Sequence, residues 1–378
     1  GNGIGNFEFA PPSGYLALCT KNLSSSFTTI DDSSAYFQTT LYTGNGSADH
    51  AITNGGNSDL QPDWVWIKNR DATDAHMIFD SSRGVTKRLS SDSNAAEVTD
   101  GDTLDAFQSD GFRVDADVKV NTNAEKYVAW QWKANGGTTT SNAAGANGAD
   151  HASVFQADNT AGFSIVTYTS DSTSGDTIIK HGLSTAPTFM IHKSRSATGS
   201  WWVYHKDLGN DGYVELNTTT PNQAGSTNVW RNTAPTSSVF KVGLNSIADS
   251  DETMVAYCFA QIQGYSKFGS YIGNGNVDGI FVYLGFKPAF VIQKQINANG
   301  EYWMMKDSER EPSNQNDANI YPNATNVEGD TNGIDLLSNG FKCRTTGAGS
   351  NASGATYIYM AFAKQPFVSS KGVPATAI

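Results

Sequence analysis

Apolar residues occur along this chain in short runs separated by polar residues, and they do not recur with the period of a helix. The runs are typically about four to eight residues long and rich in β-branched and aromatic residues. They are bounded by Gly, Asn, Ser or Pro. The run Met254–Ala260 (MVAYCFA) is apolar at every position, as in a strand whose two faces are both buried. No segment combines a helical period with capping residues, so the pattern predicts an all-β fold.

One sequence pattern occurs three times. Each copy contains a run of Pro, any residue, an aromatic residue, two apolar residues, a usually polar residue and Lys. The three runs are Pro62–Lys68 (PDWVWIK), Pro187–Lys193 (PTFMIHK) and Pro288–Lys294 (PAFVIQK). Pro suits the first position of a strand, where no ladder hydrogen bond is lost. The aromatic residue and the second apolar residue lie on one face of the predicted strand.

Four further segments accompany each run in the same order. A Tyr-led segment precedes the Pro: Tyr42–Gly46, Tyr168–Ser170 and Tyr271–Gly275. An aromatic-containing run that closes on an acid follows: His76–Asp80, Trp201–Asp207 and Trp303–Asp307. Then come the Phe-containing segments Gly111–Val114, Phe240–Val242 and Gly340–Cys343. Each copy ends on two apolar residues, Ala and an aromatic residue: Tyr127–Trp130, Met254–Tyr257 and Tyr359–Phe362. Such self-similarity predicts a tandem array of one supersecondary unit.

The repeat predicts three tandem β-sandwich modules of the jelly-roll or concanavalin-like type. Their expected ranges are 31–134, 161–263 and 264–378. Residues 135–160 are rich in Gly, Ala, Asn and Thr and are predicted to be a linker or long surface loop. Residues 1–30 are predicted to be the end of a preceding module and a linker. Because the first residue is Gly1 and not Met, we expect the chain to start inside a longer product or after a cleavage.

Composition excludes several classes of function. The chain has 25 basic and 37 acidic residues, a net charge of −12, and no basic stripe of the kind that binds nucleic acid or anionic membranes. It has no apolar stretch of about 18 residues, so no membrane insertion is expected. The cysteines Cys19, Cys258 and Cys343 lie too far apart in the sequence for a metal knuckle or a disulfide framework.

Residue types give little support for catalysis, and we predict that the protein is not an enzyme. No Gly-x-Ser-x-Gly motif frames a serine nucleophile. His192 and His205 lie in strand-like runs, where a structural or surface role is expected. The acidic residues cluster in loops, which is typical of solvated charge. A glycan-degrading tailspike would need two converging carboxylates.

One segment resembles a metal-binding loop. Asn274, Asn276 and Asp278 are spaced like the first ligands of a calcium-binding EF-hand, but Gly285 stands where that loop needs Glu. Calcium at these three residues is the candidate metal site, and the sequence indicates no other cofactor.

Aromatic residues are the candidates for sugar binding, because sugar rings stack on aromatic planes. Adjacent residues on a strand point to opposite faces, so Trp201 and Trp202 are not expected to share one core. We therefore predict glycan contacts at Trp201, Trp202, Tyr204 and Trp303.

Three segments carry a family resemblance. Residues 7–23 resemble the segment that closes a SPRY (concanavalin-like) domain in tail and appendage proteins of marine bacteriophages. Tyr127–Asn135 and Tyr357–Phe367 resemble the β-rich repeats that follow that domain, and Gly372–Ala377 resembles the usual end of such chains. The resemblance implies a virion component, and its motifs are structural and assign no functional residue.

The resemblance and the repeat together suggest an extracellular appendage on the outside of the virion, such as a tail fibre. Its lectin-like sandwiches would extend a rod and bind host-surface glycans during adsorption. Expected partners are host carbohydrate, other virion proteins and further copies of the chain, because fibres are usually homo-oligomers and often trimers. The alternatives are an architectural part, such as a capsid decoration or tail accessory protein, and a glycan-degrading tailspike.

Overall fold

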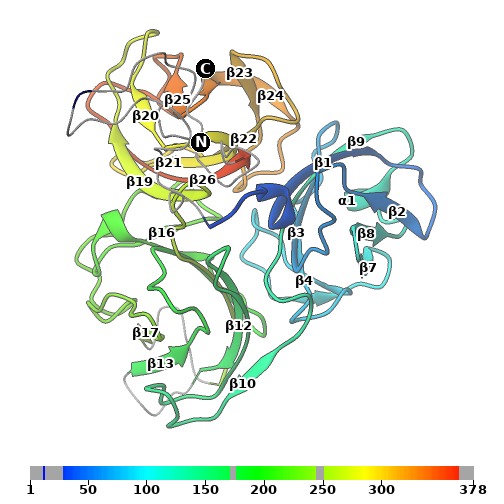
Figure 1. Ribbon diagram of the computed structural model, residues 1–378, viewed down its shortest axis with the longest axis vertical. Coiled ribbons are helices and arrows are strands. Elements are labelled where there is room, and N and C mark those ends of the chain that lie inside the picture. The colour runs from blue at the N-terminus through cyan, green and yellow to red at the C-terminus, as the bar shows by residue number, and fades with distance from the viewer. Residues whose placement is uncertain (1–11, 13–28, 171–175, 244–250, 366–378) are drawn as a thin grey trace.

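The computed structural model describes residues 12, 29–170, 176–243 and 251–365. Its regular structure is almost entirely β-strand, and every strand pairing in these ranges is antiparallel. The helical segments η2 (Ser33–Ala35), α1 (Val118–Asn121) and η3 (Lys206–Leu208) are about one turn each. None of the described helices has the length and apolar character to cross a membrane. The predicted all-β sandwich fold is confirmed (Figure 1).

The first sandwich, as we name residues 37–132, pairs a main sheet with a smaller sheet. The main sheet has the order β1-β9-β3-β4, formed by β1 (Phe37–Thr43), β9 (Lys126–Trp132), β3 (Trp64–Asn69) and β4 (Met77–Asp80). The second sheet has the order β2-β8-β7, formed by β2 (His50–Thr53), β8 (Gly111–Val114) and β7 (Leu104–Gln108). A separate ribbon joins β5 (Lys87–Arg88) to β6 (Val98–Thr99).

The second sandwich, residues 140–259, repeats this order and extends it at both edges. Its equivalent strands are β12 (Phe163–Thr169), β18 (Thr253–Phe259), β14 (Phe189–Ser194) and β15 (Trp202–His205). The added strands are β10 (Thr140–Asn142) and β11 (Ser153–Asp158) beside β12, and β16 (Val214–Glu215) beside β15. The opposite sheet consists of β13 (Asp176–Lys180) and β17 (Val239–Gly243).

The third sandwich, residues 266–365, has the same order again. The main sheet contains β19 (Ser266–Ile272), β26 (Thr356–Gln365), β21 (Lys287–Gln295) and β22 (Met304–Asp307). The opposite sheet contains β20 (Phe281–Tyr283), β25 (Gly340–Cys343), β24 (Gly329–Leu337) and β23 (Asn316–Asn319).

The Pro-led strands explain how these sheets pack. In β3 all six residues are buried. Trp64 and Trp66 face one apolar cluster, whereas Val65 and Ile67 face another, the core between the two sheets of the first sandwich. This is the expected alternation of a strand that buries both faces.

The three main sheets share one central core. Its apolar cluster contains residues from all three sandwiches, which surround it as three lobes in Figure 1. Aromatic rings from different sandwiches touch there, with centroid distances of 4.6 Å for Trp64–Tyr257, 5.7 Å for Trp132–Phe290 and 5.9 Å for Phe259–Phe362. The expected rod of successive sandwiches is therefore wrong, because the main sheets cover one another's apolar outer faces and close into a ring.

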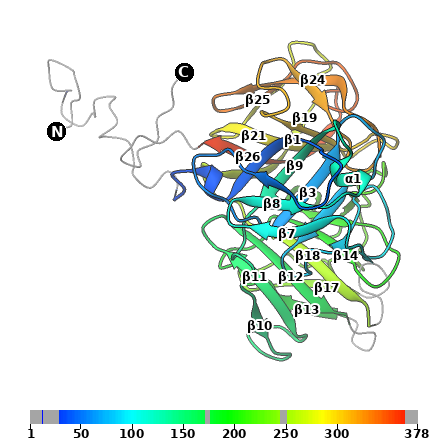
Figure 2. The same ribbon diagram turned by 90° about the vertical axis from the view of Figure 1, so that its right-hand side faces the viewer.

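The ends of the described chain meet on one side of this ring. The Ser33 hydroxyl of η2 donates to the carbonyl oxygen of Lys364 in β26 at 2.5 Å. Figure 2 shows η2 and the end of β26 on one side of the molecule and α1 on the opposite side. We call these the chain-end side and the loop side.

The predicted linker at residues 135–160 needs correction. Residues 135–160 are not only a linker or loop, because β10 and β11 lie there and β11 pairs with β12 along its whole length. A stretch of small polar residues lowers strand propensity, but β11 (SVFQAD) gains its stability from the sheet edge that it covers. The predicted limits of the three modules stay a prediction, and nearly all of the predicted segment 1–30, with Cys19, lies outside the described residues.

The repeat itself shifts at two points. In the first sandwich Tyr42 pairs with Tyr127, and in the third the equivalent Tyr271 pairs with Tyr357. The counterpart of Tyr127–Trp130 is therefore Tyr357–Met360, and not Tyr359–Phe362. A slip of two residues keeps every side chain on its face, so the apolar pattern cannot detect it. Likewise His205, and not Asp207, pairs at the position that Asp80 and Asp307 hold in the other copies.

The shared core predicts cooperative unfolding. Trp64→Ala should lower the free energy of unfolding by about 3–5 kcal/mol, because Trp64 is fully buried among rings of the first and second sandwiches. Calorimetry should show one transition that moves to lower temperature as a whole. Ile272→Ala, at a position 62% exposed, should change the free energy by no more than about 0.5 kcal/mol. Three separate transitions, only one of them shifted, would contradict a shared core.

Candidate functional site

Two predicted sugar-binding residues prove to be structural. Trp201 and Trp303 are fully buried, so neither ring is open to a ligand. The Trp201 indole N–H donates to the carbonyl oxygens of Ser90 (2.9 Å) and Ser93 (3.1 Å) in the first sandwich. The Trp303 indole N–H donates to the Glu215 carbonyl oxygen of the second sandwich at 2.9 Å. These residues therefore join neighbouring sandwiches.

The other two predicted sugar-binding residues differ in exposure. Tyr204 is 3% exposed and packs against Trp230 inside the second sandwich, so it offers no surface. Trp202 is half-buried and lies against Tyr213, with ring centroids 4.6 Å apart. Adjacent Trp201 and Trp202 do point to opposite faces of the sheet. Trp201 packs in the central core and Trp202 packs against the core of the second sandwich, so both faces are largely covered. Trp202 alone of the four keeps an accessible ring.

The predicted calcium ligands are engaged in turn hydrogen bonds. The Asn274 side-chain oxygen accepts from the Asn276 N–H (3.0 Å) and the Asn351 side-chain amide (3.0 Å). The Asn276 side-chain oxygen accepts from the Asp278 N–H at 2.9 Å. Asp278 pairs with Lys342 at 2.5 Å, and this hydrogen bond lowers the pKa of its carboxyl group. These hydrogen bonds and this ion pair hold the three side chains within the loop.

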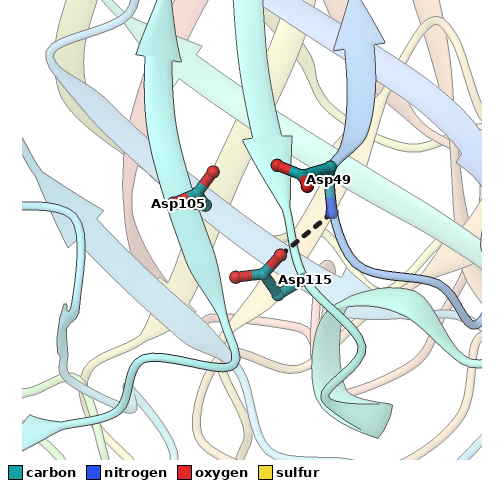
Figure 3. Close-up of side chains that lie close together, drawn as sticks. All are labelled: Asp49, Asp105 and Asp115. Atoms are coloured by element: carbon teal, nitrogen blue, oxygen red, sulfur yellow. Dashed lines mark hydrogen bonds between the residues drawn. The ribbon is translucent and has the colours of Figure 1, made fainter.

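Three other carboxylates do converge. Asp49, Asp105 and Asp115 lie around β2, β7 and β8, with one ligand atom from each within 4.8 Å of the others (Figure 3). Arg113 forms ion pairs with Asp49 at 3.3 Å and with Asp105, and Asp115 accepts from the Asp49 N–H at 2.9 Å. The guanidinium group already supplies the positive charge that a cation would bring. Sequence analysis missed this cluster because it arises from strand pairing.

A buried ionic network joins the first and second sandwiches. Arg83 pairs with Asp80, both fully buried, and with Glu97 at 3.1 Å. Glu97 also accepts two hydrogen bonds from Arg195 of the second sandwich, at 2.8 and 3.0 Å. The Tyr257 hydroxyl, also of the second sandwich, donates to Asp80 at 2.7 Å. The network therefore crosses the interface through both of its carboxylates.

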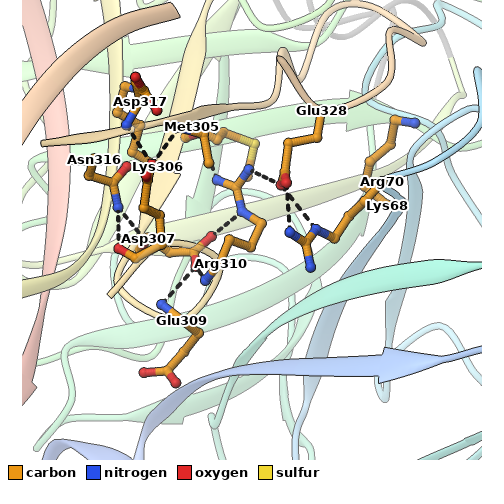
Figure 4. Close-up of polar contacts among 12 residues, drawn as sticks. Lys68, Arg70, Met305, Lys306, Asp307, Glu309, Arg310, Asn316, Asp317 and Glu328 are labelled. Carbon is orange, nitrogen blue, oxygen red and sulfur yellow. Dashed lines mark hydrogen bonds and ion pairs between the residues drawn. The ribbon is translucent and has the colours of Figure 1, made fainter. Parts of the chain in front are cut away.

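The same network recurs between the first and third sandwiches. Figure 4 shows Arg310 between Asp307 and Glu328, with Arg70 on the other side of Glu328. Arg310 lies 2.6 Å from Asp307 and 2.9 Å from Glu328. Arg70 binds both Glu328 oxygens, at 2.6 and 3.0 Å. The Trp130 indole N–H donates to Asp307 at 3.1 Å, as Tyr257 does to Asp80.

The interface between the second and third sandwiches replaces these groups with uncharged ones. At each interface one backbone N–H donates to a backbone carbonyl oxygen of the neighbouring sandwich. The donor and acceptor residues are Glu97 and Arg195 at the first charged interface, and Glu328 and Arg70 at the second. Here they are Asn222 and Ile296, 2.9 Å apart. Leu208 and Met360, both buried, occupy the positions of Arg83 and Tyr257. Burial lowers the pKa of His205, which stands at the Asp80 position, to about 4. The motif Asp-x-x-Arg, present at 80–83 and 307–310, could have indicated the two charged interfaces from sequence.

Three buried lysines occupy equivalent positions at the end of the Pro-led strands. Burial lowers the pKa of Lys68, Lys193 and Lys294 to about 8. The ammonium groups donate to backbone carbonyl oxygens, for example Lys68 to Asn69 (2.6 Å) and Lys294 to Glu301 (2.7 Å). Such contacts explain why Lys stands near the end of each of these strands although the position is buried.

Comparison with known families places the whole ring in one unit. Residues 32–366 match the model of a family described as a domain of unknown function, DUF7483. The chain belongs to this family. The matched range of the DUF7483 chain contains all three sandwiches, in keeping with their shared core. No curated protein and no solved structure matches the chain.

The two adjacent tryptophans of this DUF7483 chain should contribute differently to its stability. Trp201→Ala should lower the free energy of unfolding by about 3–5 kcal/mol, because it removes a buried ring and its bond to the first sandwich. Trp202→Ala should cost less, about 1 kcal/mol, because the ring is half-buried. Chemical denaturation would measure both. Equal effects would show that Trp201 does not join the sandwiches.

Acid should weaken the two charged interfaces. Burial alone would raise the pKa of Glu328 and Glu97, but hydrogen bonds from Arg70 and Arg195 and the charges of Arg310 and Arg83 outweigh it and hold both pKa values below normal. A lowered pKa in the folded state stabilises the fold above the unfolded pKa, about 4.5, and this stabilisation is lost as the pH falls further.

Glu328→Gln should therefore lower the stability near pH 7 and reduce its loss as the pH falls below about 4.5. Urea denaturation at a series of pH values measures both effects. The matched control is Glu309→Gln, whose side chain is 43% exposed and should matter little. An unchanged acid dependence in Glu328→Gln would argue against this ionic network as a source of stability.

Proposed function

We propose that this protein is a non-enzymatic appendage module on the outside of a bacteriophage virion, which binds host-surface glycans through its loop side. The observation that carries the proposal is the opposite placement of the chain ends and the loops (Figure 2). A ring attached by its chain-end side presents the loop side outwards. The virion assignment is supported by the resemblance of Tyr127–Asn135 and Tyr357–Phe367 to repeats of phage appendage proteins.

The strand directions determine which loops lie on the loop side. β21 begins at Lys287, which pairs with Gln365 near the chain ends, so it runs towards the loop side and finishes there at Gln295. The segment 296–303 follows and carries Tyr302, which is 41% exposed. Tyr302 lies against Tyr321 with ring centroids 4.9 Å apart. This pair and the Trp202–Tyr213 pair offer partly exposed rings on which sugars can stack.

The buried histidines support a role without acid–base catalysis. Burial lowers the pKa of His192 to about 3 and of His205 to about 4, so both are neutral at physiological pH. His192 packs between Trp230 and Phe240 inside the second sandwich. These are structural environments for histidine. The expected association of several chains into a homo-oligomer, such as a trimer, stays a prediction.

The test is binding of the fluorescently labelled full chain to candidate host cells. Saturable binding that is lost after periodate oxidation of the cell surface would support a glycan-binding appendage. Tyr302→Ala and Trp202→Ala should then each weaken binding by about fivefold or more, because stacking contributes about 1 kcal/mol or more. Tyr283→Ala is the matched control, since Tyr283 is 55% exposed but belongs to β20 and not to these loops.

An architectural role in the virion is the second candidate. It is favoured by the burial of Trp201, Tyr204 and Trp303, which serve packing and not recognition. A folded chain that binds no host cell but co-sediments with virion particles lacking it would support this role. It would also contradict the glycan-binding proposal.

A further inference from the structure

A cleft lies along β1 between the first and third sandwiches. It has a volume of about 520 Å³. One wall is the loop after β2, and the other belongs to the third sandwich. The lining includes Thr39, Leu41, Gly55, Gly56, Glu309 and Lys364.

The floor of this cleft includes an unpaired strand edge. β1 is the outermost strand of its sheet among the described residues. The Gly44 N–H donates to the Glu125 carbonyl oxygen, and the Lys133 N–H donates to the Tyr36 carbonyl oxygen. Because pairing alternates along an antiparallel ladder, the backbone groups of Thr39 and Leu41 point to the open edge. β1 (FQTTLYT) carries no charged residue to protect that edge.

The second sandwich shows how the equivalent edge is covered. There β11 pairs with β12, placing Gln156 opposite Ile165 and Val154 opposite Thr167. Tyr42 pairs with the second residue of β9, and Tyr168 pairs with the second residue of β18, so the two tyrosines are equivalent. Counting back from them, Ile165 and Thr167 correspond to Thr39 and Leu41.

Side chains of β11 fill the equivalent groove. The Phe155 ring packs so closely on Gly182 that a Cβ atom there would lie 2.2 Å from it. The Gln156 side-chain amide donates to the hydroxyls of Ser81 (2.9 Å) and Ser82 (2.6 Å) of the first sandwich. At Gly55, the counterpart of Gly182, no atom lies within 4 Å of an added Cβ.

The third sandwich closes its own groove with side chains. Lys267 of β19 donates to the Tyr283 carbonyl oxygen at 2.6 Å, and its ammonium group lies 5.1 Å from the centre of the Tyr283 ring. The Tyr283 hydroxyl reaches within 3.5 Å of the place where a Cβ of Gly285 would stand. A lysine on an edge strand also discourages further pairing. Among the described residues, the groove along β1 thus has neither an added strand, as β12 has, nor a lysine–tyrosine contact across it, as β19 has.

We propose that this cleft binds an extended peptide segment of a separate polypeptide, which pairs with β1 as an added antiparallel strand in the way that β11 pairs with β12. Main-chain hydrogen bonds to Thr39 and Leu41 would hold it, as in other cases of strand addition. Strand β11 indicates the side chains that the bound segment should carry. An aromatic side chain should lie over Gly55, as Phe155 lies over Gly182. The next residue should donate a hydrogen bond to Glu309, which occupies the position of Ser82, as Gln156 does to Ser82.

The walls of the cleft favour a single segment over a second copy of the ring. The loop at Gly55 and Gly56 and the residues Glu309 and Lys364 stand on either side of the β1 edge. A partner sheet approaching edge to edge would have to displace both walls, whereas one extended strand fits between them. Ser34 and Lys364, close to the two ends of the described chain, also line the cleft, so the segment would bind at the chain-end side. This inference is independent of the proposed glycan binding at the loop side.

The test uses the full chain and a fluorescein-labelled peptide with the sequence of residues 152–159 (ASVFQADN), which contains β11. Fluorescence anisotropy should show saturable binding. Leu41→Pro removes an edge N–H and should weaken binding at least about tenfold. Gly55→Phe, at a position where an added Cβ meets open space, should place a ring in the groove and do the same. The matched control Ser270→Pro, at the equivalent position of β19, should stay within about twofold of the parent chain.

Hydrogen exchange and light scattering distinguish the other occupants. On peptide binding the amides of Thr39 and Leu41 should exchange more slowly. Light scattering should show that two chains do not associate through this edge. Circular dichroism confirms that each variant is folded. Three results would overturn the proposal: no saturable binding, binding indifferent to both Leu41→Pro and Gly55→Phe, or slow exchange of these amides already in the free chain. A self-associated chain that Leu41→Pro dissociates would instead assign the edge to a second copy.

Discussion

Each main sheet of this protein has two apolar faces, and this constraint determines the rest of the structure. The smaller sheet of a sandwich covers only one face, so the face that carries Trp66, Ile191 or Ile292 needs a second cover. Three such faces turned towards each other supply it, and the resulting aromatic core belongs to no single sandwich. A large shared apolar area is the main source of stability in such an arrangement. The sandwiches are therefore parts of one folding unit, and the family match over residues 32–366 has the same extent.

Polar groups give the ring its geometry where the apolar core alone would not. His76, Trp201 and Trp303 stand at equivalent positions, and each bonds a backbone carbonyl oxygen of a neighbouring sandwich. Around this common contact two interfaces carry buried arginine–carboxylate networks, and the described residues of the third carry none. Breaking a buried pair is costly, whereas replacing the whole set by apolar groups can be nearly neutral. The interface with buried Leu208 and Met360 carries such an apolar replacement within the same molecule.

The sequence was informative about strands and repeats because both depend on local pattern. Alternation with a period of two indicated the fold class, and recurrent segments indicated equivalent strands. The pattern could not show which faces meet across the ring, since a central core and a surface site both require aromatic residues. Trp201 and Trp303 were therefore assigned to sugar binding although they are buried. The two-residue slip at Tyr357–Met360 and the strand β11 were missed because neither changes the alternation or the composition that the pattern measures.

Closure of the ring distinguishes this repeat protein from an open solenoid. A solenoid has a first and a last copy, whose outer faces need special capping sequences. Here every sandwich has a neighbour on each side, and the bond from Ser33 to Lys364 brings the two ends of the described chain together. No copy is terminal in space, although two are terminal in sequence. A circularly permuted chain that starts between two of these sandwiches would therefore meet the same set of contacts.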